Sequence, residues 1–173
     1  LRNHLTRCAH GLGLRVYEAW NPDAGLTPDY DVYFLGLQQN PFKYIRPASL
    51  FVFPSAWEGF PMALGEAMIC GVPAVTTDCP TGPREMLAPS TDTPPKPIRN
   101  AEQAEFGMLM PMLNQSATLV ADLEVWTETL DRLLGDAMEC ERLGRLASQR
   151  MQEFTREKIF SQWVAVLEDV MAK

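Results

Sequence analysis

The sequence has few histidines and no closely spaced pair of cysteines, which argues against a zinc site. Its 173 residues include two histidines and four scattered cysteines, Cys8, Cys70, Cys79 and Cys140. Zinc sites take their ligands from closely spaced cysteines and histidines. The first residues do not have the pattern of a secretory leader, and this density of cysteine fits a reducing cytoplasm better than an oxidising compartment. We therefore interpret all four cysteines as free thiols and predict a cytoplasmic protein without a bound metal.

Long apolar runs and an excess of positive charge are also absent. No apolar run reaches the roughly 18 residues that a membrane-spanning helix needs, so we expect at most peripheral contact with a membrane. The formal net charge of -7 provides no attraction for a phosphate backbone, and nucleic acid is not an expected partner. With 46% hydrophobic and 21% charged residues, the composition is that of one globular domain.

Strand and helix signals alternate along the chain. Asn40-Pro41 opens a short helix, and residues 62–70 have the composition of a helix that closes at Gly71. The apolar run at 50–54 does not alternate with polar residues, which is typical of a strand covered on both faces. Apolar runs rich in β-branched and aromatic residues predict strands at 31–37, 50–54 and 73–77, and the apolar residues at 107–110 predict a further short strand.

This alternation predicts a doubly wound, Rossmann-like α/β fold, in which right-handed crossovers join a parallel sheet with helices on both faces. Ligands of such sheets bind beyond the carboxyl ends of the strands. Residues 88–100 contain four prolines and are predicted as a loop. From about Val120 the pattern is helical. Two apolar stripes there are interpreted as core-facing, Leu123, Trp126, Leu130 and Leu134 in the first and Ile159, Trp163, Val166 and Val170 in the second.

Two glutamates, Glu58 and Glu66, are separated by seven residues where a predicted strand passes into a predicted helix. A helix start at a strand's carboxyl end presents unpaired N–H groups and the positive end of the helix dipole, which attract a diphosphate. Gly59 permits close backbone approach, and Pro61 suits the first helical position because it lacks an N–H. Glu66, about one turn inside, is suited to the vicinal hydroxyls of a ribose. The alternative is that both glutamates are ordinary solvated side chains, with Glu58 capping the helix.

The string around these glutamates resembles the signature of family 4 retaining glycosyltransferases, in particular a bacterial polysaccharide subset. It reads LFVFPSAWEGFPMALGEAMICGVPAVTTDCPTGPREML, and the resemblance extends upstream through FLGLQQNPFKYI and downstream through AEFGMLMP, from about Val32 to the end. It implies the GT-B fold, which has two Rossmann-like domains with the acceptor side in the N-terminal one. Residues 1–173 are then part of the C-terminal, nucleotide-sugar-binding domain.

The family's residue roles transfer to this sequence motif by motif. The first glutamate of the E-x7-E pair contacts the donor sugar, which gives Glu58 the catalytic role, and the second, Glu66, holds the ribose. Pro61 has no N–H, so only its carbonyl or ring can contribute. The resemblance places the remaining donor contacts at Gly59, Phe60, Pro61 and Met62. The string from Asp78 to Glu85 is interpreted as a turn and helix start beside the site, with Arg84 and Glu85 in local salt bridges.

The resemblance implies a hexosyltransferase that needs no metal or other cofactor. Its donor would be a UDP- or GDP-sugar, and its acceptor a bacterial polysaccharide or lipid-linked glycan at the inner face of the cell membrane. Membrane contact would come through the acceptor domain. That domain and the family's diphosphate-clamping Arg and Lys are not in this sequence, so we expect residues 1–173 alone to lack transfer activity. The alternative is a non-catalytic module for nucleotide-sugar binding or assembly.

Overall fold

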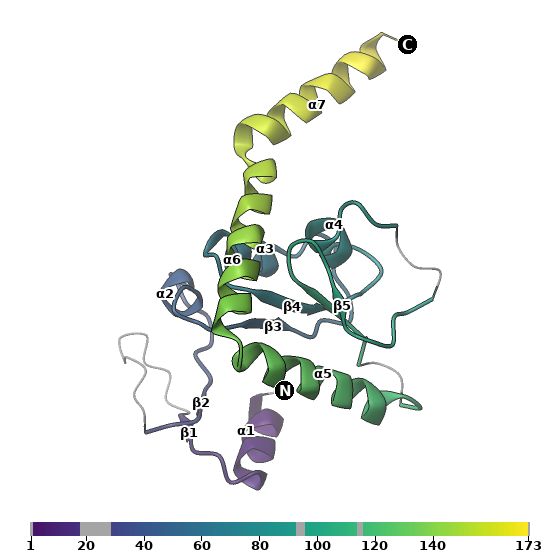
Figure 1. Cartoon of the computed structure of the whole chain (residues 1–173). Coiled ribbons are helices and arrows are strands. Elements are labelled where there is room, and N and C mark those ends of the chain that lie inside the picture. The colour runs from purple at the N-terminus through teal and green to yellow at the C-terminus, as the bar shows by residue number, and fades with distance from the viewer. Residues whose placement is uncertain (1, 18–28, 93–95, 114–115, 173) are drawn as a thin grey trace. The chain divides into compact units, whose positions relative to one another are not determined.

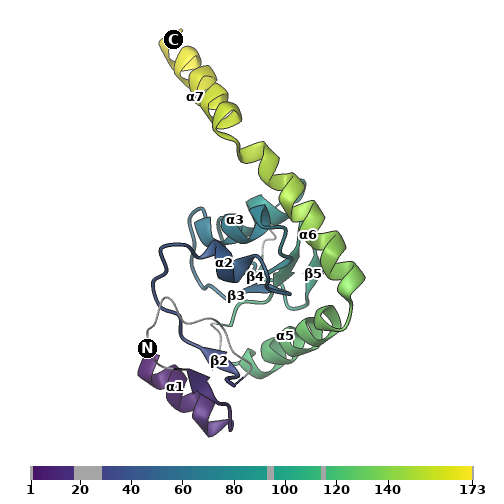
Figure 2. The same cartoon turned by 90° about the vertical axis from the view of Figure 1, so that its left-hand side faces the viewer.

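The chain forms two compact units. The structure, a computed structural model, describes residues 2–17, 29–92, 96–113 and 116–172. The first unit is Leu1–Pro41 and the second is Phe42–Lys173, and Figures 1 and 2 show their elements in two views. Every residue to which the sequence assigns donor binding belongs to the second unit.

The first unit consists of a helix followed by two short parallel strands. Helix α1 (Arg2–Gly11) leads to β1 (Val16–Tyr17), which pairs with β2 (Val32–Tyr33). Hydrogen bonds from the side chain of Arg15, at 3.1 and 2.8 Å, lower the pKa of the Asp31 carboxyl to about 2. The strand predicted at 31–37 is limited in the structure to β2, and its partner β1 was not predicted.

The second unit is built on a four-stranded sheet with the order β3-β4-β6-β5. The strands β3 (Phe51–Phe53), β4 (Ala74–Thr77) and β6 (Met108–Met110) are parallel, as predicted. The edge strand β5 (Glu102–Gln103) runs antiparallel to β6. It was not predicted, because its two polar residues carry no apolar pattern.

Helices cover both faces of this sheet. Helix α3 (Met62–Ile69) lies on one face and α5 (Leu119–Leu134) on the other, as both views show (Figures 1 and 2). Helix α6 (Ala137–Met151) passes from one side to the other. Its Leu143 packs in the apolar cluster with residues of α5, and its Ala147 packs in the cluster with residues of α3. This arrangement is the predicted doubly wound architecture.

Each face has its own apolar cluster, because adjacent residues of a strand point to opposite sides. One cluster includes the fully buried residues Leu64, Met68, Ala74, Met86, Leu87 and Leu109. The other includes Val75, Met108, Met110, Trp126, Leu133 and Leu143. The neighbours Ala74 and Val75 face different clusters, so β4 is buried on both sides.

Strand β3 is less covered than its apolar sequence predicts. Its central residue, Val52, is 42% exposed. In the sheet order β3 lies at an edge, beside β4 alone. The expectation that the strand at 50–54 is covered on both faces is therefore wrong, since apolar composition does not show where in the sheet a strand lies.

The first of the two predicted C-terminal stripes is partly buried. In α5, Trp126 is buried and Leu130 is half-buried, while Leu123 and Leu134 are exposed. The interpretation as a core-facing stripe is correct for the middle of the helix. It is wrong at Leu123 and Leu134.

The second stripe is not part of the core. It lies on α7 (Arg156–Met171), in which no residue is buried, and its Trp163, Val166 and Val170 are all more than half exposed. The prediction of core packing is wrong here. Periodicity shows which side of a helix is apolar, but it does not show whether the chain supplies a partner for that side.

Helix α6 and the turn after α3 meet at a backbone contact. Gly71, in the turn after α3, has a φ of +72°. A Cβ added to Gly144 of α6 would lie 2.0 Å from the carbonyl oxygen of Gly71. Gly71 is needed for its left-handed backbone, and Gly144 because it has no side chain. The contact lets α6 lie directly against the turn.

Replacing Gly144 tests this contact. We expect Gly144→Ala to lower the free energy of unfolding by about 1–3 kcal/mol, because the added methyl group must push two backbones apart. Urea unfolding measures the change. Gly135→Ala is the control, since its Cβ would lie 3.4 Å from the nearest atom, the carbonyl oxygen of Asp131. Equal stability of the two variants would show that the contact imposes no constraint.

Candidate functional site

The loop between β3 and α3 holds the side chain of Glu58. The Ser55 hydroxyl donates a hydrogen bond of 2.6 Å to Oε1 of Glu58, and Glu58 is half-buried. The loop follows the carboxyl end of β3, where ligands of doubly wound sheets bind. We call residues 55–61 the donor loop.

Threonine hydroxyls attach the donor loop to β4 and to the loop that follows it. Three threonine hydroxyls, on β4 and the loop that follows it, donate hydrogen bonds to backbone carbonyls of β3 and the donor loop. The pairs are Thr76 with Phe53, at 3.0 Å, Thr77 with Ser55, and Thr81 with Glu58. These bonds fix the backbone from the end of β3 to Glu58. The backbone at both ends of the Ser55–Glu58 contact is therefore held by residues of β4 and of the loop after it.

A close contact between two glycines joins the same two loops. Gly82 has a φ of +92°, and a Cβ on it would lie 2.1 Å from the carbonyl oxygen of Gly59 and 2.7 Å from Cδ of Pro61. Both the backbone conformation and the lack of space require glycine at position 82. Gly59 has open space where its own Cβ would be, so its side is free for a ligand to approach.

The remaining residues assigned to the donor lie at the start of α3. The helix begins at Met62, as the composition of residues 62–70 predicts, and Pro61 is its N-cap and not its first helical residue. Pro61 is buried, and its carbonyl accepts a 3.2 Å hydrogen bond from the Gly65 amide, so it serves the helix start. Met62 is exposed, and Glu66 is half-buried one turn further on. The N–H groups of this first turn have no partner within the helix.

The structure contradicts the alternative in which Glu58 caps α3. The N-cap residue of this helix is Pro61, which makes no side-chain capping hydrogen bond. The Glu58 carboxylate accepts the hydroxyl of Ser55 instead. The first-turn amides of α3 are therefore not used by Glu58.

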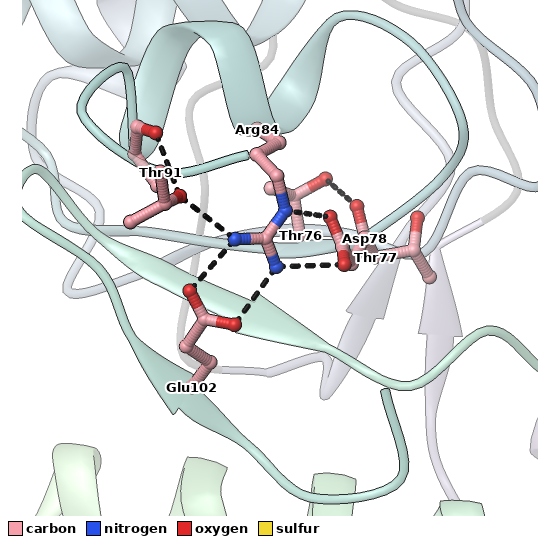
Figure 3. Close-up of polar contacts among 7 residues, drawn as sticks. Thr76, Thr77, Asp78, Arg84, Thr91 and Glu102 are labelled. Carbon is pink, nitrogen blue, oxygen red and sulfur yellow. Dashed lines mark hydrogen bonds and ion pairs between the residues drawn. The ribbon is translucent and has the colours of Figure 1, made fainter. Parts of the chain in front are cut away.

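Arg84 anchors the loop after β4 through a buried ionic network (Figure 3). It lies in α4 (Pro83–Leu87) and is 5% exposed. Its Nε and Nη2 donate to the two carboxylate oxygens of Asp78, at 2.9 and 2.8 Å. Its Nη1 and Nη2 donate to the carboxylate of Glu102, at 2.9 and 2.8 Å, and Nη1 also donates to the Thr91 hydroxyl at 3.0 Å.

These contacts use all five N–H donors of the Arg84 guanidinium. Arg84 is therefore engaged with the protein and has no donor left for a phosphate. The predicted salt bridge of Arg84 is confirmed. Glu85 has a different role from the one predicted, since its carboxylate accepts a 3.3 Å hydrogen bond from the Gly82 amide and closes the start of α4.

The surroundings of the site shift several pKa values. The hydrogen bonds that Arg84 donates to Glu102 and Asp78 raise the pKa of Arg84, and the hydrogen bonds from Arg84 lower the pKa of Glu102. Burial raises the pKa of the Cys79 thiol, and the charge of Glu58 acts in the same direction. Cys79 is therefore a protonated thiol beside the site, which is unfavourable for a nucleophile.

The described residues offer neither a cluster of metal ligands nor a membrane-spanning helix. Those residues contain no group of three or more His, Cys, Asp or Glu side chains that could hold a metal ion. Among the helices of the same residues, none is long and apolar enough to cross a membrane. The four cysteines have free thiols.

Comparison with known proteins identifies the family. Residues 10–136 match the family model described as glycosyl transferases group 1. The chain belongs to the group 1 glycosyltransferases. It is 34% identical over 145 residues to an uncharacterised glycosyltransferase of Methanocaldococcus jannaschii, in an alignment that covers 80% of this chain and 36% of that protein. The chain thus spans little more than a third of that relative's length.

Two further proteins are similar over part or all of the chain. An N-acetylgalactosaminyltransferase of Campylobacter jejuni, named for a diphospho-undecaprenol-linked substrate, is 31% identical over 92 residues, which are 53% of this chain and 21% of that protein. The solved sucrose-phosphate synthase from Thermosynechococcus elongatus aligns with a TM-score of 0.61 at 22% identity, over 99% of this chain and 34% of that one. The likeness confirms the predicted fold, a partial Rossmann-like domain of the GT-B type.

Sequence reasoning named the glutamates but missed the side chains that hold the donor loop. Ser55 precedes Glu58 by three residues, a spacing at which a hydroxyl can reach a carboxylate across a turn. This local signal was available. The sequence gives no comparable signal for the Thr81 contact, because that contact joins residues 23 positions apart and depends on the pairing of β3 with β4.

Removal of the Arg84 guanidinium tests the ionic network. We expect Arg84→Met to lower the free energy of unfolding by about 3–5 kcal/mol, because it leaves the buried Asp78 carboxylate without its cation. Arg145→Met is the matched control, since Arg145 forms an exposed pair with Glu141 and such pairs contribute about 0–1 kcal/mol. Urea unfolding compares the two, and a loss for Arg84→Met no larger than the control's would contradict a stabilising role.

The lowered pKa of Glu102 predicts a pH dependence of stability. Its contribution is complete above the ordinary value of 4.5 and is lost as the pH falls through the lower pKa of the folded state. Compared with Glu102→Gln, the native protein should therefore lose part of its stability advantage as the pH is lowered below 4.5. Unfolding in urea at a series of pH values measures this, with Glu141→Gln as control. A stability difference that does not change with pH would disprove the linkage.

Proposed function

We propose that this domain binds the nucleotide-sugar donor of a retaining glycosyltransferase of family 4, in the bacterial polysaccharide subset. The observation that carries the proposal is the arrangement of the donor loop. Glu58, the open side of Gly59 and the first turn of α3 follow one strand end, and the loop after β4 holds them there. Ligands of this fold class bind at that edge of the sheet.

The diphosphate of the donor is proposed to lie at the start of α3. The first-turn amides there have no partner within the helix, and the helix dipole favours an anion. Gly59 and Phe60 lead into this turn, and Gly59 has no side chain to exclude a ligand. Met62 supplies an amide, whereas Pro61 supplies none, so its part is to set the direction of the helix.

Glu66 is proposed to hold the ribose of the nucleotide. It lies one turn beyond Met62 and is half-buried. A carboxylate can accept two hydrogen bonds at once, which matches the two adjacent hydroxyls of a ribose. The base is proposed to be uracil or guanine.

Glu58 is proposed as the residue that supports the sugar during transfer. Positive charge develops at the anomeric carbon as the bond to the diphosphate breaks, and a fixed carboxylate nearby stabilises it. The hydrogen bond from Ser55 holds that carboxylate before the substrate binds. The role is electrostatic and orienting, with the acceptor attacking from the face that the diphosphate leaves, so the anomeric configuration is retained.

The donor sugar is proposed to be a hexosyl unit, and the acceptor a polysaccharide or lipid-linked glycan at the inner face of the cell membrane. The Campylobacter relative, whose name specifies transfer of N-acetylgalactosamine to a diphospho-undecaprenol-linked sugar, supports this class of acceptor. The acceptor site belongs to a second domain in the proposed enzyme. Robust transfer by residues 1–173 alone would contradict that division.

Substitution of Glu66 tests the ribose contact. In the enzyme that contains this domain, Glu66→Gln keeps the shape of the side chain but weakens its charge-assisted hydrogen bonds, so nucleotide binding should weaken by about 1.5–3 kcal/mol. Titration calorimetry with UDP and with GDP measures the affinity, and Glu128→Gln on the exposed side of α5 is the control. Unchanged affinity for the nucleotide that the native enzyme binds would reject the assignment.

Substitution of Glu58 tests the catalytic role. The contact of Glu58 should tighten as charge develops on the sugar. Glu58→Gln should therefore lower kcat by about 100-fold or more and raise the donor KM by less. Affinity for UDP or GDP alone should be retained, unlike in Glu66→Gln. Steady-state kinetics and the melting temperature, measured on the same variant, separate catalysis from folding. A destabilised variant with near-normal kcat would end the catalytic assignment.

A further inference from the structure

Arg150, near the end of α6, joins four parts of the second unit. Its Nε and Nη2 donate to the carbonyls of Met86 and Glu85, at 3.2 and 3.0 Å. Its guanidinium carbon lies 4.8 Å from the ring centre of Phe154 and 5.6 Å from that of Phe106. The carbonyls belong to the last turn of α4, where a cation is favourable. Arg150 is thus held by α4 on one side and by two aromatic rings on the other.

The Phe154 ring connects this cation to the donor loop. Phe154 is the last residue of the 3-10 turn η1 (Gln152–Phe154) that follows α6. Its ring centre lies 5.4 Å from that of Phe60, with the ring planes inclined at 58°. Contacts of this geometry are attractive beyond the apolar area that they bury. The contact reaches the donor loop between Gly59 and Pro61.

The contact restrains Phe60 while leaving its ring accessible. Phe60 is 47% exposed, so burial alone does not hold it. Other restraints on the donor loop act on the residues before Phe60. Thr81 donates a hydrogen bond to the carbonyl of Glu58, and Gly82 lies against the carbonyl of Gly59. Phe154 is therefore the described contact that acts directly on the Phe60 side chain.

We infer that Arg150 and Phe154 are positioning residues for donor binding, and that they act by holding Phe60 and the nearby amides of Gly59 and Met62. Arg150 orients the Phe154 ring, and that ring in turn limits the movement of the donor loop. The inference rests on the proposed function for its effect on donor binding. Its effect on the loop does not depend on that function.

The inference gives the turn after α6 a role in the site although it lies about 90 positions later in the sequence. The stacking of a guanidinium on an aromatic ring needs a planar cation, so a methionine at position 150 would keep much of the side-chain volume and lose the interaction. A leucine at position 154 would remain apolar and lose the ring. A tyrosine there keeps the ring and serves as the conservative replacement.

The experiment measures the loop and the ligand separately, on the 173-residue chain. Hydrogen exchange followed by mass spectrometry reports the protection of the amides of Gly59, Phe60 and Met62, since Pro61 has none, and calorimetry with UDP and with GDP reports binding. We expect Arg150→Met and Phe154→Leu each to speed exchange at these amides, and to weaken binding of the nucleotide that the native chain binds, by about 3-fold to 10-fold, the range of one lost aromatic contact. Phe154→Tyr should restore both quantities. Arg145→Met, on the same helix and at an exposed ion pair with Glu141, should change neither.

Each outcome decides one part of the inference. Faster exchange at 59–62 in Phe154→Leu, with recovery in Phe154→Tyr and an unchanged melting temperature, supports the positioning role. Native exchange rates at 59–62 in a folded Phe154→Leu protein would overturn it. If Arg150→Met does not fold, the two Phe154 variants still decide. If the native chain binds neither UDP nor GDP, the proposed function fails while the exchange measurement still tests the positioning.

Discussion

A single backbone contact determines how the two loops of the candidate site lie against each other. Gly82 approaches the carbonyl of Gly59 so closely that any side chain at position 82 would overlap with it. The Thr81 hydroxyl, one residue earlier, binds the carbonyl of Glu58. The shape of the donor loop therefore depends on the loop after β4 as much as on its own residues, and the Glu58 carboxylate depends on both.

The loop after β4 can play this part because it is anchored on both sides of the contact. Asp78 at its start and Arg84 at its end are joined by two hydrogen bonds in a buried site, and Glu102 holds the same guanidinium from β5. Burial of such charges is costly unless every donor is satisfied. Because the guanidinium is saturated, the contacts that hold the ends of this loop come from the protein itself. A side chain held in this way suits the electrostatic role that is proposed for Glu58.

The sequence was sufficient to predict the central part of the fold and the residues of the motif, and insufficient for what depends on three-dimensional pairing. Strands β3, β4 and β6 and helix α3 could be predicted because apolar runs and glycine mark them directly. Strand β5 could not, because two polar residues form a strand only when β6 is beside them. The stripe on α7 was misread, since an apolar pattern looks the same with or without a partner.

The saturated guanidinium of Arg84 also has a consequence for how this protein can change over evolutionary time. Its partners come from three separate segments, at Asp78, Thr91 and Glu102. Loss of one acceptor leaves a donor unpaired in a buried site, so the effect of a second substitution depends on the first. These positions should therefore vary together among homologues, in correlated sets, and a replacement accepted in one lineage should be harmful when transferred singly into another.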